Sequence, residues 1–136
     1  MNNRVARVSM FVTPTNPRFI DKAWTRGGDA YILDIEDSIA PAEKQRCREL
    51  IRISIEKASK GGASIYVRIN KPYVDADLPY AVWPGVDRIM LPKTESAAEV
   101  QHAHELITKL EIERGIVPGT DRKSTRLNSC HANISY

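Results

Sequence analysis

The sequence predicts an α/β fold in which short parallel strands alternate with helices. Four β-branched, apolar runs are each followed by a helical segment, and no segment between them has the turn sequence of a β-hairpin. Strands joined in this way run parallel with right-handed crossovers. The polar residues that interrupt each unit fall just after its strand, so we expect them together at the carboxyl edge of the sheet.

The first unit consists of a strand over residues 5–12 and a helix that begins at Pro17. The strand is rich in Val, Met and Phe, and Thr13 follows it. Asn16 is suited to cap the helix and Pro17 to occupy its first position. Gly27 and Gly28 end the unit. The expected buried face of the helix comprises Phe19, Ile20, Ala23 and Trp24.

The second unit carries the most distinctive residues. A short apolar strand over residues 30–33 ends in three acids, Asp34, Glu36 and Asp37. Pro41 then opens a helix that reaches about residue 59. Its apolar stripe comprises Cys47, Leu50, Ile51, Ser54 and Ala58.

The third and fourth units repeat the pattern. A strand over residues 64–69 carries Arg68 and leads to Asn70, and a short helical piece follows around residues 76–82. A strand over residues 86–91 precedes Lys93 and Glu95. Ser96-Ala97-Ala98-Glu99 is a capping box that starts a helix ending near residue 114. Its expected inward residues are Val100, Ala103, Ile107 and Leu110.

These positions predict a charged site at one edge of the sheet. The carboxylates of Asp34, Glu36 and Asp37 could ligate a hard cation or hold a cationic substrate group, with Arg68 nearby. The competing interpretation is that one carboxylate caps the next helix while the others are solvated. The residues alone leave both interpretations open.

Composition excludes several classes of function. The formal charge is +3, but residues 121–136 hold three of the 20 basic and one of the 17 acidic residues, which leaves 17 and 16. The basic residues form no cluster, which argues against nucleic-acid binding. No apolar run is long enough for a membrane span and residues 1–7 do not resemble a signal peptide, so we expect a cytoplasmic protein. Cys47 and Cys130 fit no metal or redox spacing.

Several of these segments resemble the citrate lyase beta-subunit-like proteins of the HpcH/HpaI aldolase superfamily. The resemblance rests on motifs in family order and at family spacing, which together are highly specific. They are Phe11-Val12-Thr13-Pro14, the run from Pro17 to Ala23, the run from Ile32 to Lys44, Val67-Arg68-Ile69-Asn70, Asp77-Leu78, and the run from Pro84 to Ser96.

The resemblance implies a TIM barrel that cleaves or forms a carbon–carbon bond in a 3-hydroxyacyl thioester. Malyl-, citramalyl- and citryl-thioesters on coenzyme A or acyl carrier protein are the family's usual substrates. It also implies a Mg²⁺ ion that stabilises charge on oxygen as the bond breaks. The complete protein would then be a homotrimer or homohexamer.

The resemblance also assigns roles to individual residues. Arg68 corresponds to the family arginine that binds the carboxylate and oxyanion, for which a forked guanidinium is suited. The alternative for Arg68 is an interior salt bridge to Asp34 and Glu36, and the two roles are compatible. Asp34, Glu36 and Asp37 would support the metal and the arginine without being the principal metal ligands. Asn70 would contact substrate, and Lys22 would lie near the nucleotide of coenzyme A.

The resemblance stops at Gly119-Thr120, before the family's principal metal ligands, so we expect no metal site in this chain. Residues 1–120 are interpreted as the first four strands of a TIM barrel, a half-barrel without activity of its own. Residues 121–136 have no apolar period and match one reading frame of a common short-read sequencing adapter. We interpret them as a non-native tail.

Two alternatives to a thioester lyase remain. One is a class II pyruvate aldolase of the same superfamily acting on free hydroxy-oxo acids. The other is a non-catalytic barrel subunit of a larger complex. The acidic motif and the segment from Asn16 to Lys22 favour the thioester lyase.

Overall fold

One parallel sheet organises the molecule. The computed structural model describes residues 8–36, 39–92 and 95–116, and the backbone of 127–129. The strands lie in the order β1-β2-β3-β4-β5, and each neighbouring pair is parallel. The strands are β1 (Ser9–Val12), β2 (Ala30–Asp34), β3 (Ser64–Arg68), β4 (Arg88–Leu91) and β5 (Leu127–Ser129). The predicted α/β class and the predicted parallel pairing of the first four strands are confirmed.

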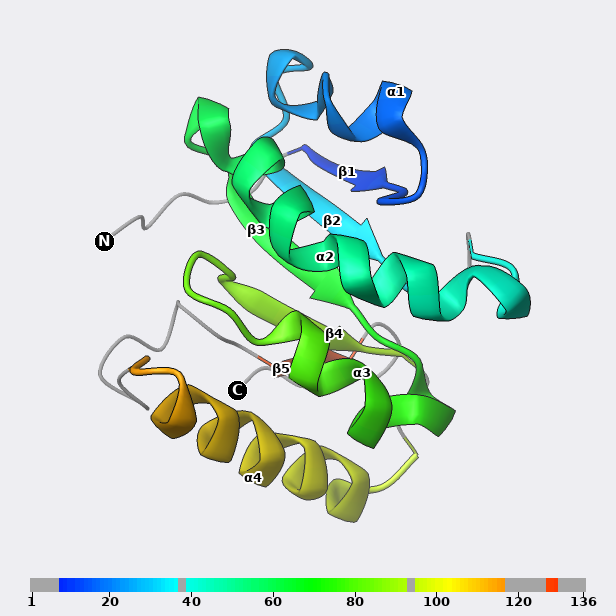
Figure 1. The fold of residues 1–136 in the computed structure, drawn as a ribbon. Coiled ribbons are helices and arrows are strands. Elements are labelled where there is room, and N and C mark those ends of the chain that lie inside the picture. The colour runs from blue at the N-terminus through cyan, green and yellow to red at the C-terminus, as the bar shows by residue number, and fades with distance from the viewer. Residues whose placement is uncertain (1–7, 37–38, 93–94, 117–126, 130–136) are drawn as a thin grey trace.

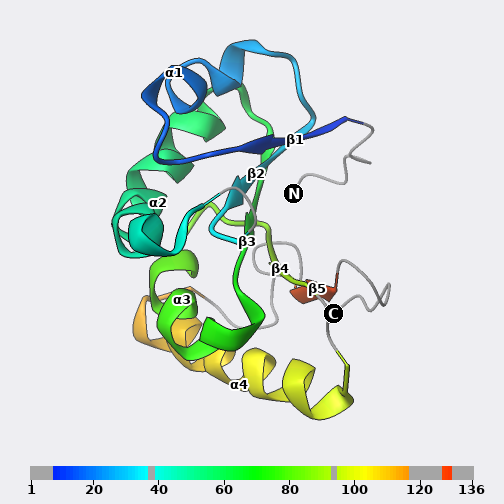
Figure 2. The same cartoon turned by 90° about the vertical axis from the view of Figure 1, so that its right-hand side faces the viewer.

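The α-helices all cover the same face of this sheet (Figures 1 and 2). They are α1 (Pro17–Ile20), α2 (Lys44–Ala58), α3 (Val74–Ala81) and α4 (Ala97–Glu113). Short 3₁₀ turns extend several of them, and they are η1 (Ala23–Thr25), η2 (Pro41–Glu43), η3 (Ser59–Gly61) and η4 (Lys71–Tyr73). Within the described part of the chain, none of the helices has both the length and the apolar character that crossing a membrane requires.

The main core lies between the helices and the sheet. Strand side chains alternate between the two faces, so every second residue meets the helices. The strand residues of this core include Tyr31, Leu33, Ile65, Val67, Ile89 and Leu91, each nearly inaccessible to solvent. A second, smaller cluster lies on the face away from the helices. It is formed by the strand residues that alternate with those of the main core, namely Ala30, Ile32 and Tyr66, and Met90 packs against it.

Local signals in the sequence account for the starts of α1 and α4. The Asn16 side chain accepts a hydrogen bond from the Arg18 amide at 3.1 Å, and Pro17 takes the first position of α1. The Ser96 hydroxyl accepts from the Glu99 amide at 3.3 Å at the start of α4. The Glu99 carboxylate accepts from the amide of Glu95, one residue before the cap, so the capping box is shifted by one position.

Some predicted elements differ from the structure. The first strand covers residues 9–12, and positions 5–7 lie outside the described residues. The first helix is a single turn followed by η1, which leaves Phe19 and Trp24 substantially exposed while Ile20 and Ala23 are buried. In α2, Ile55 is buried and Leu50 only half-buried, because the helix turns a slightly different face to the sheet than the predicted stripe.

The fifth strand lies within the segment predicted to be a non-native tail. Residues 127–129 pair in parallel with β4, in the register Ile89↔Leu127, Met90↔Asn128 and Leu91↔Ser129. The sheet therefore has one strand more than the four that the sequence predicted. The remainder of residues 121–136 lies outside the described residues.

Candidate active site at the carboxyl edge of the sheet

A bidentate ion pair joins the carboxyl ends of β2 and β3. Asp34 and Arg68 are register partners at the ends of these strands, on the face away from the helices. Arg68 donates from Nε to Asp34 Oδ1 at 2.9 Å and from Nη2 to Oδ2 at 2.8 Å. The Asp34 side chain is 2% exposed and the Arg68 side chain 14%. A charge-assisted fork of this kind fixes the plane of the guanidinium.

Two further groups hold Arg68 in place. Glu36 Oε2 lies 3.4 Å from Arg68 Nε, and the Glu36 amide donates to Asp34 Oδ1 at 2.9 Å. The ring of Phe11, on β1, lies 4.4 Å from the centre of the guanidinium, close enough for a cation–π interaction. The predicted meeting of Asp34, Glu36 and Arg68 at one edge is thus confirmed in the geometry.

Asn70 lies beside this group but turns toward the helices. Its side-chain amide donates to the carbonyl of Ile35 at 3.1 Å and to Asp77 Oδ2 at 2.9 Å. Its own amide N–H donates to the same Asp77 oxygen at 2.7 Å, and its Oδ1 accepts from Lys44 at 2.8 Å. Asn70 is 4% exposed. In this structure its polar atoms therefore serve contacts between β2, β3, α2 and α3.

The sequence analysis did not single out Lys44, Arg48 or Asp77 as site residues. Asp77 is fully buried on α3, and Arg48 Nε donates to its Oδ1 at 2.6 Å. Two signals in the sequence could have drawn attention to them. Asp77 has the helical spacing of the apolar residues Leu78 and Ala81, at i, i+1 and i+4, and Lys44 puts a cation in the first turn of a helix, where the helix dipole disfavours it.

Lys22 is not brought to the Arg68 group. It precedes η1, which packs against η3, the turn just before β3, and its neighbour Asp21 pairs with Lys57 near the end of α2. These contacts place it toward the amino ends of the strands.

The other predicted rim residues are only partly described. Asp37 and Lys93 lie outside the described residues. Glu95 and Glu99 lie 3.5 and 3.2 Å from the ammonium of Lys71, which links η4 to the start of α4. The backbone carbonyl of Thr13 accepts from the amide of Asn16. These contacts tie neighbouring loops together at the edge where Arg68 lies.

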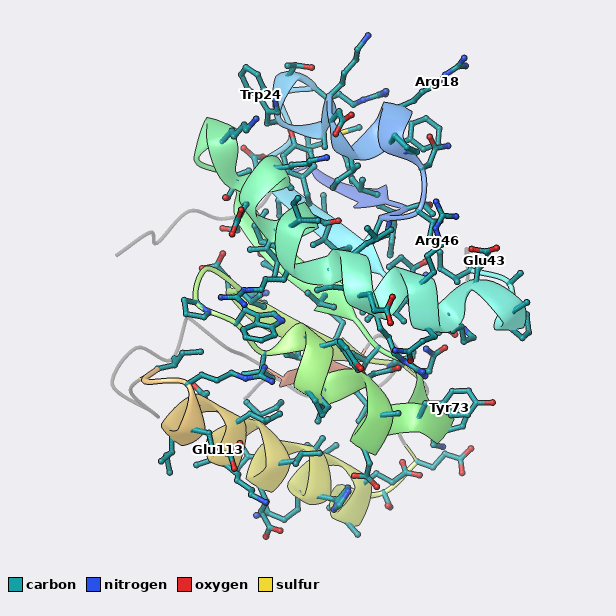
Figure 3. All side chains as sticks on the ribbon, in the orientation of Figure 1. Arg18, Trp24, Glu43, Arg46, Tyr73 and Glu113 are labelled. Carbon is teal, nitrogen blue, oxygen red and sulfur yellow. The ribbon has the colours of Figure 1, made fainter. Side chains whose placement is uncertain are left out.

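A hollow of about 360 Å³ opens beside this network. It is bounded by the loops that follow β2, β3 and β4. Its lining residues are Glu36, Lys44, Asn70, Lys71, Pro72, Tyr73, Pro92 and Glu95. Of these, Tyr73 stands at the outer end of the same edge in Figure 3. The lining holds both signs of charge, which suits a polar ligand better than an apolar one.

Cys47 is unsuited to nucleophilic chemistry at this edge. Burial, with the neighbouring Asp34 carboxylate, raises the pKa of its thiol to about 12. The thiolate is the reactive form of cysteine, and it is absent at neutral pH under these conditions. The Cys47 Sγ lies 3.6 Å from the Asp34 carbonyl oxygen, to which the thiol donates. Cys47 is therefore a packing residue of the core.

The described residues do not fit a divalent cation. Among residues 8–36, 39–92 and 95–116 no three His, Cys, Asp or Glu side chains come close enough to share a metal ion. Both oxygens of Asp34 accept hydrogen bonds from Arg68, and a metal ion there would have to displace the guanidinium. The described residues therefore do not form a metal site of their own.

Parallel strands followed by helices, with the Arg68–Asp34 pair at the carboxyl edge, fit an α/β protein of the aldolase-like barrel class. Residues 7–130 match the HpcH/HpaI aldolase/citrate lyase family, and the chain belongs to that family. The resemblance in the sequence is thereby confirmed.

Curated relatives agree with this assignment. The chain is 34% identical over 131 residues to citrate lyase subunit beta of Leuconostoc mesenteroides subsp. cremoris, which covers 94% of this chain and 43% of the relative. It is 30% identical over 118 residues to L-malyl-CoA/beta-methylmalyl-CoA lyase of Rhodobacter capsulatus, which covers 82% and 37%. The enzymes named are carbon–carbon lyases. The chain thus spans about two fifths of the length of these relatives.

Solved structures show the same similarity. The citrate lyase beta subunit from M. tuberculosis, complexed with oxaloacetate and magnesium, aligns with a TM-score of 0.57 at 32% identity, covering 75% of this chain and 45% of that one. The Haloferax volcanii malate synthase complex with magnesium and glyoxylate aligns with a TM-score of 0.73 at 18% identity, covering 95% and 43%. The latter supports the fold alone.

Proposed function

We propose that the complete protein is a lyase that breaks or forms a carbon–carbon bond in a 3-hydroxyacyl thioester. Malyl-, citramalyl- and citryl-thioesters, carried on coenzyme A or acyl carrier protein, are the substrates we favour. Family membership and relatives named citrate lyase and malyl-CoA lyase support this class. The observation that carries the proposal is the Arg68 guanidinium, held by two carboxylates at the carboxyl edge of the sheet.

In this proposal Arg68 binds the carboxylate of the 2-oxo fragment and stabilises negative charge that develops on oxygen. A guanidinium suits both tasks, since it is permanently charged and its N–H groups form a planar fork. Asp34 and Glu36 occupy the Nε and Nη2 side of the guanidinium and so keep its plane in one orientation. The pairing requires no rearrangement before substrate arrives, which is what makes electrostatic stabilisation effective.

The proposal has further parts, which concern the metal ion, three more residues and the assembly. A Mg²⁺ ion would act in the complete protein, as magnesium in the structure of the M. tuberculosis relative suggests. Its principal ligands would lie beyond Thr120. Asp37 would support the site, Lys22 would contact the nucleotide of coenzyme A, and Asn70 would approach substrate. We also propose a cytoplasmic homotrimer or homohexamer.

The 136-residue chain alone is expected to be inactive, and residues 121–136 are proposed to be a non-native tail. Reading the genomic locus past Thr120 tests the proposed tail and the presence of the metal ligands, and a lyase assay of the 136-residue chain tests its inactivity. A reading frame that continues with a glutamate and an aspartate after the next two strands would support the lyase. A continuation identical to residues 121–136 would contradict the proposed tail.

The assay of the complete protein separates the candidate functions. We expect Mg²⁺-dependent release of acetyl-coenzyme A from malyl- or citramalyl-coenzyme A. Turnover of free hydroxy-oxo acids in place of thioesters would favour the class II pyruvate aldolase. A complete protein that folds without Mg²⁺ and turns over neither thioesters nor free hydroxy-oxo acids would favour a non-catalytic subunit.

A further inference from the structure

The first turn of α2 holds the segment that carries the acidic residues of the site. Lys44 Nζ donates to the carbonyls of Ile35 and Glu36, each at 3.1 Å, and Cys47 Sγ donates to the carbonyl of Asp34 at 3.6 Å. Lys44 and Cys47 are three residues apart and so share one helix face. The carbonyls that they bind belong to three consecutive residues, the last of β2 and the two that follow it.

Lys44 also ties this segment to β3. Its ammonium donates to Asn70 Oδ1 at 2.8 Å, and the Asn70 side-chain amide donates in turn to the Ile35 carbonyl at 3.1 Å. Asn70 lies two residues beyond Arg68 and is itself fixed by the buried Asp77. One ammonium thus joins the loop that carries Glu36 to the loop that follows Arg68.

The position of Lys44 is costly for the helix, which indicates a specific role. A cation in the first turn of a helix opposes the helix dipole, at about 0.3–1 kcal/mol. The ammonium donates hydrogen bonds to three oxygens that carry no formal charge, namely the carbonyls of Ile35 and Glu36 and Oδ1 of Asn70. An uncharged side chain at this position could not bind all three oxygens.

We propose that Lys44 is a positioning residue for Arg68. By fixing the carbonyls of Ile35 and Glu36 against Asn70, it sets where the carboxylates of Asp34 and Glu36 meet the guanidinium. The part of this role that concerns catalysis rests on the proposed function. The structural coupling between Lys44 and the Arg68 pair stands independently of any activity.

Hydrogen exchange in the 136-residue chain tests the coupling without a substrate. The probes are the Arg68 Nε–H and the Glu36 amide, which both donate to Asp34 Oδ1. The reference is the Ile65 amide, which donates to Asp87 Oδ2 at 2.8 Å at the other end of β3. In Lys44→Met, exchange at both probes is expected to rise at least about 10-fold, with Ile65 unchanged.

The matched control is Lys57→Met, which removes another ammonium from the same helix. Lys57 pairs with the exposed Asp21, far from the probes, so exchange at Arg68 and Glu36 should stay as in the unaltered chain. Equal acceleration at all three positions in Lys44→Met would make Lys44 a general stability residue and overturn the proposal. Unchanged exchange at Arg68 and Glu36 would overturn it as well.

A second variant covers the case in which Lys44→Met does not fold. Lys44→Ala leaves the three oxygens and room for a small cation, so ammonium chloride, compared with tetramethylammonium chloride, should restore slow exchange at the Arg68 Nε–H. Failure to fold in ammonium would contradict the proposal.

In the complete protein, Lys44→Met should lower kcat more than it raises KM. An inactive complete protein that still shows the exchange effect would refute the proposed function alone.

Discussion

The Arg68 guanidinium is bound on several sides by groups from different strands. Asp34 and Glu36 supply negative charge after β2, and Phe11 of β1 supplies an aromatic face. Such a pair is partly removed from water, so its attraction must offset a large desolvation cost. Removing one partner leaves the other charge uncompensated, which makes the pair testable by substitution.

We predict that Asp34→Asn destabilises the chain by about 2–3 kcal/mol. Asn has nearly the same shape as Asp, but it leaves the Arg68 guanidinium without its charged partner. The measurement is the free energy of unfolding in urea. The control is Asp75→Asn, which removes the carboxylate that pairs with His102; both side chains are largely exposed, so the loss should stay below about 1 kcal/mol. The double variant Asp34→Asn/Arg68→Met should be more stable than Asp34→Asn alone. Equal losses for Asp34→Asn and Asp75→Asn would show that the Arg68 pair adds no more than a surface contact.

The buried carboxyl of Glu111 gives a prediction about how the free energy of unfolding depends on pH. Its side chain is 6% exposed on α4, and burial raises the pKa of its carboxyl. The folded state therefore binds the proton more tightly than the unfolded state. The stabilisation that results is present at pH below the unfolded pKa and is lost as the pH rises through the folded pKa.

We therefore expect Glu111→Gln to be more stable than the unaltered chain at neutral pH, with the advantage shrinking as the pH falls. Urea unfolding at a series of pH values measures it. Glu113→Gln, on the exposed side of the same helix, serves as the control. An advantage of Glu111→Gln that stays constant with pH would mean that the carboxyl titrates alike in both states.

At the scale of the elements, helix starts are encoded locally. The Ser96 hydroxyl caps α4 by accepting from the Glu99 amide. We predict that Ser96→Ala costs about 1 kcal/mol, because an amide of the first turn loses its acceptor. Thermal unfolding measures the loss, with Gln101→Ala, on the exposed face of α4, as the control. A Ser96→Ala variant as stable as the control would mean that Glu99 alone is sufficient to cap the helix.

Such local signals explain which elements the sequence could predict. Asn16 and Ser96 mark helix starts by residue type alone, and both cap helices in the structure. The order of polar residues after strands likewise predicted that Asp34, Glu36 and Arg68 would meet. These features depend on neighbours in the chain or on the shared direction of parallel strands.

Features that depend on tertiary contacts were harder to predict. Phe19 and Trp24 follow a helical spacing, yet the helix ends after one turn and leaves both exposed. Lys44 reads as an ordinary surface lysine until its distant partner Asn70 is placed beside it. Asn70 was predicted to contact substrate. In the structure its side chain binds Lys44, Asp77 and the carbonyl of Ile35, and residue spacing in the sequence does not reveal these contacts.

At the scale of the whole molecule, the sheet has helices on one face only among the described residues (Figure 2). The other face carries Phe11, Ile32 and Tyr66 together with the Arg68 pair. In a closed barrel that face would line the interior.

The strand β5 gives the last prediction. It covers one edge of β4 through three register pairs, so deleting residues 121–136 exposes unpaired backbone groups on β4. At about 1 kcal/mol for each lost hydrogen bond, we expect a loss of about 1–3 kcal/mol in the free energy of unfolding and faster aggregation. Urea unfolding and light scattering of residues 1–120 against the full chain measure both. Replacing residues 127–129 by Gly-Ser-Gly at unchanged length is the control, and it should reproduce the loss if strand pairing is its cause. If residues 1–120 unfold at the same urea concentration as the full chain and aggregate no faster, β5 contributes nothing to the stability of the sheet. That result would be expected if residues 121–136 are a non-native tail.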